Sequence, residues 1–424
     1  MLFRLAIAAC VFVACTPAGA PDACGGLAPE ACVEHARAIQ EQDPMRQHDA
    51  WVHALYDAAC LTGHAPGCFA SATWLSEGHP TPYPFLAIDR FTKACVGGEG
   101  QACWSAGSAR LQVEGELPDL AAAAADFDAG CRLDHAQSCV DLGLMMLAGQ
   151  GVEQHPSMAY QRFQNACDLG DPRGCTQVGL ALRDGKGVDA DGEAGLLTLE
   201  AACDEDYAPA CGLGAITLDE GVAVSKDPAR RLALLMKGTA LLDPVAVGTL
   251  AEELPPDHAA REAALTTLTE RCTAASPLPC RLAATLASSP ADAEPWLRTG
   301  CTGADHESCG LLGVLVNKGH LTARTGDPVS LWLDKGCRAR QPLACWTLAS
   351  QQLPDVEQTW NGSRHVRAAL RVACRGGVAD ACVAWRDLID KTAPASMANP
   401  DVEKPPSPQR TWLDPALDPP TRAP

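Results

Sequence analysis

Two cysteine pairs frame the stretch that decides the fold, residues 131–175, which reads CRLDHAQSCVDLGLMMLAGQGVEQHPSMAYQRFQNACDLGDPRGC. Cys131 with Cys139 and Cys167 with Cys175 are each spaced C-x7-C, and the two pairs lie 36 residues apart. Residues eight apart on one helix are separated by about 12 Å, whereas a disulfide needs Cα atoms within about 7 Å. The chain must therefore reverse between paired cysteines, and the Gly, Pro and Asp residues there are typical of turns.

The residues between Cys139 and Cys167 predict two helices joined by a loop. The first helix, CVDLGLMMLAG, runs into QGVEQHPS, and the second is MAYQRFQNAC. Residues 175–203 repeat this order with CTQVGLALRDG, KGVDADG and EAGLLTLEAAC. Each unit is therefore predicted to be an αα-hairpin, and each bridge to join the end of one helix to the start of the next.

The same spacing recurs along the chain with a period near 36 residues, which indicates a repeat array of about ten units. The pairs expected to form disulfides are Cys24 with Cys32, Cys60 with Cys68, Cys95 with Cys103, Cys131 with Cys139, Cys167 with Cys175, Cys203 with Cys211, Cys272 with Cys280, Cys301 with Cys309, Cys337 with Cys345 and Cys374 with Cys382. A 69-residue interval before Cys272 predicts one more unit, in which Thr239 and Val247 replace both cysteines. Disulfide partners are expected to be lost together, so this gap supports the pairing. A zinc site would need a different cysteine spacing and paired histidines.

Residues 239–300 are expected to be irregular. The unit at Val247 lacks its bridge, and only 21 residues separate Cys280 from Cys301 where 28 is usual. Seven residues, about two helical turns, are missing. We expect the array to change curvature or loosen in this region.

A small residue four positions after the second cysteine predicts close helix packing. Glycine is unfavourable inside a helix by about 1 kcal/mol relative to alanine, so its recurrence needs a structural reason. The last unit has Arg386 at this place, as a terminal helix without a following neighbour would allow. The small residues are Ala36, Ala72, Gly107, Gly143, Gly179, Ala215, Ala251, Ala284, Gly313 and Ala349.

Composition excludes some classes of function. The 22 cysteines of this chain indicate an oxidising compartment. A net charge of -19 argues against nucleic-acid binding, which needs a cationic surface. No internal apolar run approaches the roughly 20 residues that span a bilayer.

The first residues predict export as a lipoprotein. Arg4 precedes an apolar run, residues 5–14, and the sequence FVAC at residues 12–15 resembles a bacterial lipobox, although Phe12 replaces the usual Leu. Residues 1–14 are then a signal peptide, Cys15 carries the lipid, and residues 15–28 form the lipidated N-terminus and a spacer. Removal of Cys10 and lipidation of Cys15 leave an even number of cysteines.

Two other processing sites stay open. The sequence AGA at residues 18–20 permits cleavage as a soluble secreted protein, although Pro21 would follow the cut. The sequence IAAC at residues 7–10 also reads like a lipobox, but it leaves a short apolar run. An uncleaved membrane anchor is the third alternative. Thr16, in place of Asp, favours sorting of the lipoprotein to the outer membrane.

The repeat resembles the Sel-one-like repeat (SLR) family, and more narrowly its cysteine-rich secreted bacterial branch. The resemblance is carried by Ala-Cys-x-x-Gly, a second Cys with Leu-Gly behind it, and Gly-x-Gly-Val, as in residues 136–171 and 172–207. It covers roughly residues 29–390 and implies a right-handed αα superhelix related to tetratricopeptide solenoids. Residues 391–424 are rich in Pro without a period, so a disordered tail is expected. Its Trp412 and Leu413 are candidate motif anchors, or a chance hydrophobic pair.

No catalytic motif stands out, and no cofactor is predicted. The GKG at residues 185–187 has the look of a phosphate loop, but no strand precedes it, so an inter-helix turn is the better interpretation. Asp184, Asp189 and Asp191 are either a loose calcium site or a solvated acidic loop. His64, His135 and His306 lie in the bridged turns, where turn and cap roles explain them.

The predicted function is a non-catalytic scaffold for protein–protein interaction, lipid-anchored in the bacterial envelope at the outer membrane or in the periplasm. Solenoids bind proteins or peptides on a concave face, and the acidic surface suits partners with basic segments. The membrane is touched only through the lipid at Cys15, and no nucleic acid is bound. The resemblance implies one alternative, a β-lactamase or penicillin-binding hydrolase, although S-x-x-K, S-D-N and K-T-G are all missing.

Overall fold

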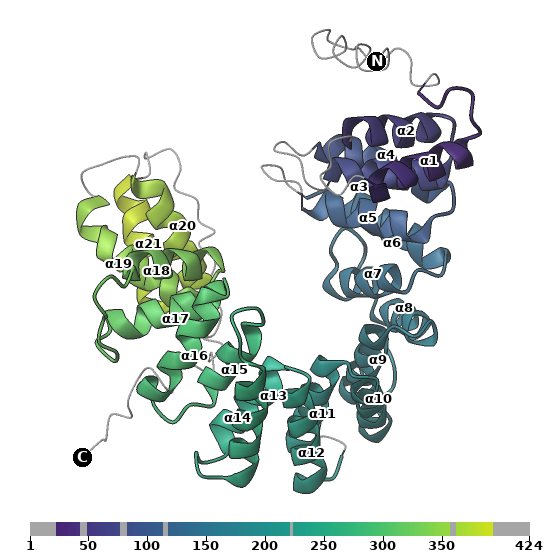
Figure 1. Cartoon of the computed structure of the whole chain (residues 1–424). Helices are drawn as coiled ribbons and strands as arrows, with labels where there is room; N and C mark the ends of the chain where they lie inside the picture. The colour runs from purple at the N-terminus through teal and green to yellow at the C-terminus, as the bar shows by residue number, and fades with distance from the viewer. Residues whose placement is uncertain are drawn as a thin grey trace, which may run out of the picture. The chain divides into compact units, whose positions relative to one another are not determined.

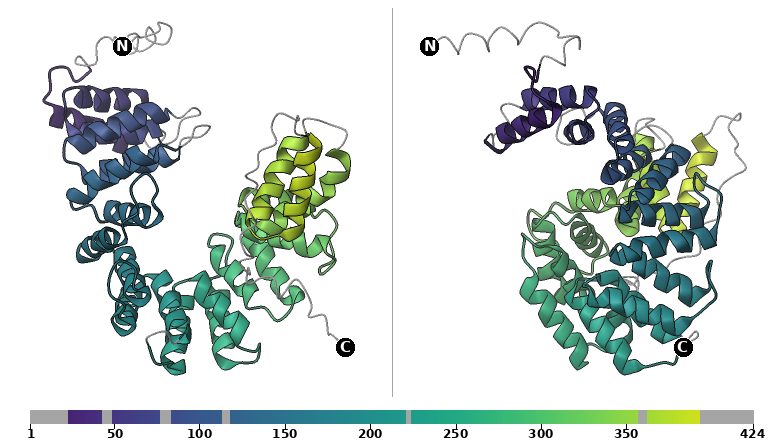
Figure 2. Two further views of the ribbon diagram at one scale, coloured as in Figure 1. Left: turned by 180° about the vertical axis from the view of Figure 1, so that it is seen from behind. Right: turned by 90° about the vertical axis from the view of Figure 1, so that its right-hand side faces the viewer.

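The computed structural model describes residues 23–42, 49–76, 83–112, 118–220, 224–356 and 362–392. These residues form 21 helices and one isolated β-bridge, between Thr273 and Ser276. The predicted all-α class is confirmed, and Figures 1 and 2 show helix following helix without a sheet in this described part. The predicted signal peptide, the lipidation site Cys15 and the tail beyond Thr392 lie outside the described residues.

The chain divides into two compact units, with the boundary at Ala202, near the end of α10. The helices of the N-terminal unit are α1 (Pro29–Gln42), α2 (Asp49–Leu61), α3 (Ala65–Ser76), α4 (Pro84–Val96), α5 (Gly100–Leu111), α6 (Leu120–Arg132), α7 (Ala136–Ala148), α8 (Pro156–Asp168), α9 (Pro172–Asp184) and α10 (Gly192–Asp204). The helices of the C-terminal unit are α11 (Ala208–Glu220), α12 (Pro228–Ala240), α13 (Pro244–Glu253), α14 (Ala259–Arg271), α15 (Leu278–Thr285), α16 (Pro290–Thr302), α17 (His306–Asn317), α18 (Val329–Arg338), α19 (Pro342–Val356), α20 (Gly362–Arg375) and α21 (Ala379–Thr392).

The helices pair in chain order into ten hairpins, from α1–α2 to α19–α20, and α21 follows the last of them. Within each unit, the two helices of a hairpin pack on each other, as α5 does with α6, and the second helix also packs on the first helix of the next hairpin, as α6 does with α7. Each hairpin buries its apolar face only against its sequence neighbours. This is the αα-hairpin repeat architecture that the cysteine period predicts.

The predicted small residues lie where the two helices of a hairpin approach most closely. A Cβ at Gly143 of α7 would stand 2.5 Å from the ring of Phe163 on α8, and one at Gly107 of α5 would stand 2.7 Å from the ring of Phe127 on α6. Both rings are almost fully buried. Glycine is therefore present so that a large aromatic side chain can lie across the helix backbone, which offsets its low helix propensity. The side chain of Arg386 lies outside the described residues.

The Gly-x-Gly of the inter-helix loop has a structural role at both glycines. Gly149 ends α7 in the left-handed conformation with φ of 66°, which is a common helix C-cap. Gly151 has φ of 70°, and a Cβ there would overlap the Leu120 carbonyl at the start of α6. Gly185 and Gly187 repeat this arrangement one hairpin later. The GKG sequence is therefore a packing turn, as its position between two helices predicts.

The irregular region has a shortened hairpin. Six residues run from Cys280 to the end of α15, against ten from Cys139 to the end of α7, and the following loop has four residues against seven. The helix α16 keeps the usual 13 residues. The seven missing residues are therefore one turn of helix and three residues of the loop, rather than two full turns of helix. The change in curvature stays a prediction.

Arg261 of α14 holds three helices together in this region. Its buried guanidinium donates to the carbonyl oxygens of Ala251 (2.8 Å) and Leu254 (2.7 Å) at the end of α13, and to those of Leu286 (3.0 Å) and Ala287 (3.3 Å) after α15. Helix C-termini carry partial negative charge, so a cation is favourable there. Burial lowers the pKa of this guanidinium. The contact adds a non-covalent link in the region that lacks one disulfide.

Candidate interaction surface

Ten disulfides link the helices at their junctions, and they are the ten pairs predicted from the spacing. The bridges join Cys24 to Cys32, Cys60 to Cys68, Cys95 to Cys103, Cys131 to Cys139, Cys167 to Cys175, Cys203 to Cys211, Cys272 to Cys280, Cys301 to Cys309, Cys337 to Cys345 and Cys374 to Cys382. The second cysteine lies inside the helix that follows the turn, and Cys103 of α5, Cys211 of α11 and Cys345 of α19 are all completely buried there. The predicted pairing is therefore confirmed at every bridge.

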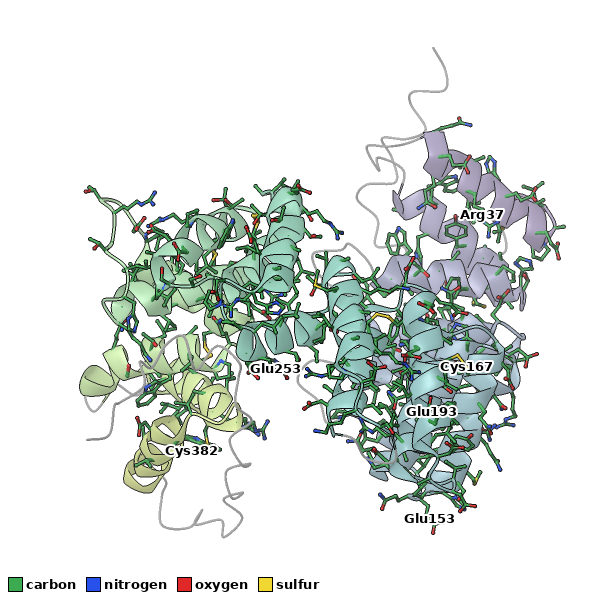
Figure 3. All side chains as sticks on the ribbon, turned by 90° about the horizontal axis from the view of Figure 1, so that it is seen from below. Arg37, Glu153, Cys167, Glu193, Glu253 and Cys382 are labelled. Carbon is green, nitrogen blue, oxygen red and sulfur yellow. A yellow bond between two sulfur atoms is a disulfide. The ribbon has the colours of Figure 1, made fainter. Side chains whose placement is uncertain are left out.

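Nine of the ten bridges have nearly the same geometry, and Cys24–Cys32 differs from them. Their Cα–Cα distances run from 4.2 Å for Cys60–Cys68 to 5.5 Å for Cys24–Cys32. Figure 3 labels Cys167, which bridges α8 to α9, and Cys382, which bridges α20 to α21. Two bridges start outside a helix, because Cys24 precedes α1 and Cys272 follows the end of α14. The bridged junctions of the predicted fold are confirmed.

The third residue after the first cysteine is left-handed at nearly every junction. It is glycine in four junctions, for example Gly63 with φ of 89°, but a residue with a side chain in five. The five are Asp134, Asp206, Leu242, Ala304 and Arg340, with φ between 57° and 66°. A left-handed residue that is not glycine costs about 1–2 kcal/mol. The chain reverses direction at this left-handed residue, and the sequence pattern did not predict its conformation.

The junction between α12 and α13 has the same turn without a disulfide. The amide of Leu242 donates to the Thr239 carbonyl and that of Asp243 to the Gly238 carbonyl, as the amides of Asp134 and His135 do at a bridged junction. Thr239 and Val247 are buried in place of the cysteines. Asp243 caps α13 by accepting from the amides of Val245 (3.1 Å) and Ala246 (3.2 Å). Burial raises the pKa of this carboxyl group, and the amide donors oppose that shift.

Histidine side chains cap four helices. The Nδ1 atoms of His64, His135, His155 and His258 accept from backbone amides at the N-termini of α3, α7, α8 and α14. The cap role predicted for His64 and His135 is confirmed. His306 is the first residue of α17, whose cap is Asp305, so a cap role for His306 was wrong. Burial lowers the pKa of His135, which favours the neutral imidazole that a cap requires.

Exposed apolar side chains recur in the bridged turns of the N-terminal unit. We call Leu61, Val96, Leu133 and Leu169 the turn row, because each stands one or two residues after the first cysteine of its pair. Their exposed fractions are 54%, 85%, 42% and 44%. Single exposed apolar residues are ordinary, but four in the bridged turns of consecutive repeats form a surface that can contact a partner. An apolar residue one or two positions after the first cysteine was the signal that the sequence offered.

The turns that carry this row pack on one another. A Cβ at Gly97 would lie 2.5 Å from the Cβ of Ala65, and a Cβ at Gly100 would lie 3.2 Å from the Leu133 carbonyl oxygen. Three successive turns are therefore in direct contact. The turn row is a property of the assembled repeats, since no single hairpin presents more than one of its members.

Ser71, His53 and Asp57 lie together between α2 and α3, which bears on the hydrolase alternative. The Ser71 hydroxyl is 3.2 Å from His53 Nε2 and donates to Asp57 (3.2 Å), which also accepts from Arg90 (2.7 Å). His53 stacks on Trp74 with ring centroids 4.0 Å apart. Ser71 is completely buried, so a substrate cannot reach its hydroxyl group. The cluster joins α2, α3 and α4 by polar contacts and does not support a serine nucleophile.

Asp184, the last residue of α9, is paired with two neighbouring cations. Asp184 accepts from Arg183 (2.6 Å) and Lys186 (2.8 Å), and these bonds lower the pKa of its carboxyl group. Among the described residues, no group of three or more His, Cys, Asp or Glu side chains is arranged to hold a metal ion. No described helix is long and apolar enough to cross a membrane.

These features define the class of the chain, a disulfide-bridged αα-hairpin repeat protein. No family model matches the sequence, and no curated protein matches it. The chain is similar to c5321, a protective antigen of uropathogenic Escherichia coli strains that displays an SLR fold, at 17% identity and a TM-score of 0.48 over 86% of this chain and 80% of that one. It is also similar to a Sel1 repeat protein from Oxalobacter formigenes, at 15% identity and a TM-score of 0.43 over 53% of this chain and 89% of that one.

A further similar structure is the immunity protein Pa5087 from Pseudomonas aeruginosa, at 19% identity and a TM-score of 0.32 over 49% of this chain and 81% of that one. Two of these three structures are thus SLR proteins, the family that the sequence resembles. The identities and TM-scores of these similar structures are low. The repeat architecture of this chain is therefore established by its own helix order, repeat period and disulfides.

Proposed function

We propose that this protein is a non-catalytic interaction scaffold of the bacterial envelope, exported and lipid-anchored at Cys15. The observation that carries the interaction role is the turn row, whose apolar side chains are left exposed in the bridged turns of consecutive repeats. Ten disulfides support folding in an oxidising compartment. The lipid at Cys15 would supply the membrane contact, so the repeats themselves need no apolar surface for the bilayer.

The domain organisation that goes with this proposal is a signal peptide over residues 1–14, a lipidated N-terminus and spacer over 15–28, the repeats over 29–390 and a tail over 391–424. Cys24 already belongs to the folded part, because it is bridged to Cys32 and packs on the first hairpin. Binding to the concave face stays a prediction beside the turn row.

Intact mass of the protein from its native host, before and after reduction with alkylation, tests the export and anchoring. We expect a mature chain that begins at an acylated Cys15 and gains twenty alkyl groups only after reduction. A retained signal peptide, or thiols that react before reduction, would contradict the envelope location.

The interaction role has its own test. A photo-cross-linking amino acid at position 133 or 169, in the turn row, should capture a discrete host protein, and the same probe at Leu197 should not. Leu197 is a suitable control because it is exposed on α10 of the same unit but lies outside the bridged turns. Equal capture from all three positions would rule out the turn row as a specific binding surface.

A further inference from the structure

A cavity of about 450 Å³ opens beside the Cys60–Cys68 disulfide in the N-terminal unit. Its walls come from the turn between α2 and α3 and from the last turns of α4. Residues that line it are Cys60, Leu61, Gly63, Cys68, Asp89, Thr92, Lys93, Val96 and Gly97. This volume is in the range of sites that hold a few ligand side chains.

The apolar part of the cavity consists of the disulfide and two members of the turn row. Leu61 and Val96 both line the cavity, and they come from two turns that are in contact, because Gly97 packs on Ala65. Both side chains remain more than half exposed. Covering them with an apolar side chain of a partner would remove this surface from water, which favours binding.

The polar part of the cavity favours a cation. The helices α2 and α4 end at Leu61 and Val96, so the negative ends of two helix dipoles point to the same opening. The one cation among the lining residues, Lys93, is 2.8 Å from the carboxylate of Asp89. That carboxylate also accepts from Arg90, which is paired with Asp57 (2.7 Å) as well, so the two cations and the two carboxylates offset one another. The chain as a whole carries a net charge of -19, which adds a long-range attraction for positive groups.

We propose that this cavity binds a peptide segment of a partner protein in which an arginine or lysine is flanked by leucine-like side chains. The cation would lie toward the two helix ends, and the apolar side chains would cover Leu61 and Val96. This inference rests on the proposed scaffold function and names the chemistry of the partner at the first two positions of the turn row.

The test uses the folded, oxidised full-length protein and a fluorescein-labelled synthetic peptide of alternating leucine and arginine. A peptide with glutamate in place of arginine is its matched control. We expect fluorescence anisotropy to show saturable binding of the arginine peptide that weakens as salt is added. The glutamate peptide should not bind.

Two variants locate the site. Leu61→Asn and Val96→Asn should each weaken binding of the arginine peptide by at least about tenfold, the loss expected when about 1.4 kcal/mol of apolar contact is removed without a change of charge. Leu197→Asn is the matched control, because Leu197 is 53% exposed, close to the 54% of Leu61. Circular dichroism should show the same helix content in all three variants, since the altered side chains are exposed.

Unchanged binding in both the Leu61 and Val96 variants would overturn the proposal, and so would equal binding of the glutamate peptide or no binding of the arginine peptide. Specific cross-linking from positions 133 and 169 together with any of these results would leave the scaffold function standing. Loss of specific cross-linking together with retained peptide binding would reject the scaffold proposal instead.

Discussion

At the scale of single residues, the junction turn stores backbone strain. The left-handed position accepts glycine without cost, yet Ala304 has φ of 65° in the turn between α16 and α17. Its side chain is exposed, so no packing compensates for the conformation. The turn is held by the Cys301–Cys309 bridge and by the hydrogen bond from the Asp305 amide to the Gly300 carbonyl.

Substitution of this alanine tests the strain directly. Ala304→Gly should raise the free energy of unfolding of the C-terminal unit by about 0.5–1 kcal/mol, because relief of strain exceeds the added flexibility of glycine. Ala263→Gly, at an exposed position inside α14, should lower it by about 1 kcal/mol. Urea unfolding followed by circular dichroism measures both, and a destabilised Ala304→Gly would contradict the strain.

His135 makes one helix start sensitive to pH. Its Nδ1 accepts from the amide of Ser138 (3.3 Å) and lies near the Ser138 hydroxyl (3.0 Å). Burial is the main cause of its lowered pKa, Asp141 and Asp171 oppose that shift, and Arg173 adds to it. The folded state therefore binds its proton less readily than the unfolded state does.

The stabilisation from this cap should be complete above the ordinary histidine pKa of about 6.5 and decline as the pH falls below it. His135→Asn keeps a cap acceptor without a titrating group. The protection factors of the first amides of α7, measured by hydrogen exchange at pH 8 and pH 5, should fall less on acidification in the variant than in the unchanged protein. An identical acid effect in both proteins would exclude His135 as its source.

At the scale of helices, Arg261 provides part of the stabilisation that the missing disulfide would give. Arg261→Met should lower the local stability of α13 and α15 by about 3 kcal/mol, because several buried carbonyl groups lose their donor. Arg132→Met is the control, since the Arg132 side chain is 69% exposed. Hydrogen exchange at the C-terminal amides of α13 and α15 provides the readout, and equal protection in both variants would refute this role.

The unbridged junction can be given its disulfide. Because the turn between α12 and α13 has the hydrogen bonds of the bridged turns, Thr239→Cys combined with Val247→Cys should oxidise spontaneously. The new bridge should add about 2.5 kcal/mol, the value for a closed loop of eight or nine residues. Mass spectrometry after alkylation detects the bridge, and two persistent free thiols would show that this junction differs in geometry.

At the scale of the whole molecule, stability is a sum of local terms, because each hairpin packs only on its neighbours in sequence. Each bridge contributes about 2.5 kcal/mol, so reduction should lower the melting temperature sharply. Much of the helix should remain at 25 °C, since the hairpin cores do not depend on sulfur alone. Circular dichroism melts with and without reductant test this, and an unchanged melting temperature would contradict it.

The sequence by itself determined the hairpin order, the ten bridges and the small residues at the helix crossings. These features are local: the cysteines of a bridge are eight residues apart, and Gly143 meets Phe163 within one hairpin. The period of 36 residues then repeats the same short-range contacts along the chain.

Only the tertiary structure decided which side chains face water and which buried polar groups have hydrogen-bond partners. The left-handed turn residue, the carbonyl groups that Arg261 holds, the buried Ser71 and the cavity at Leu61 and Val96 all depend on contacts between different helices. The physical reason is that burial and hydrogen bonding are properties of the packed repeats. The sequence pattern places these residues in helices and turns but does not specify their contact partners.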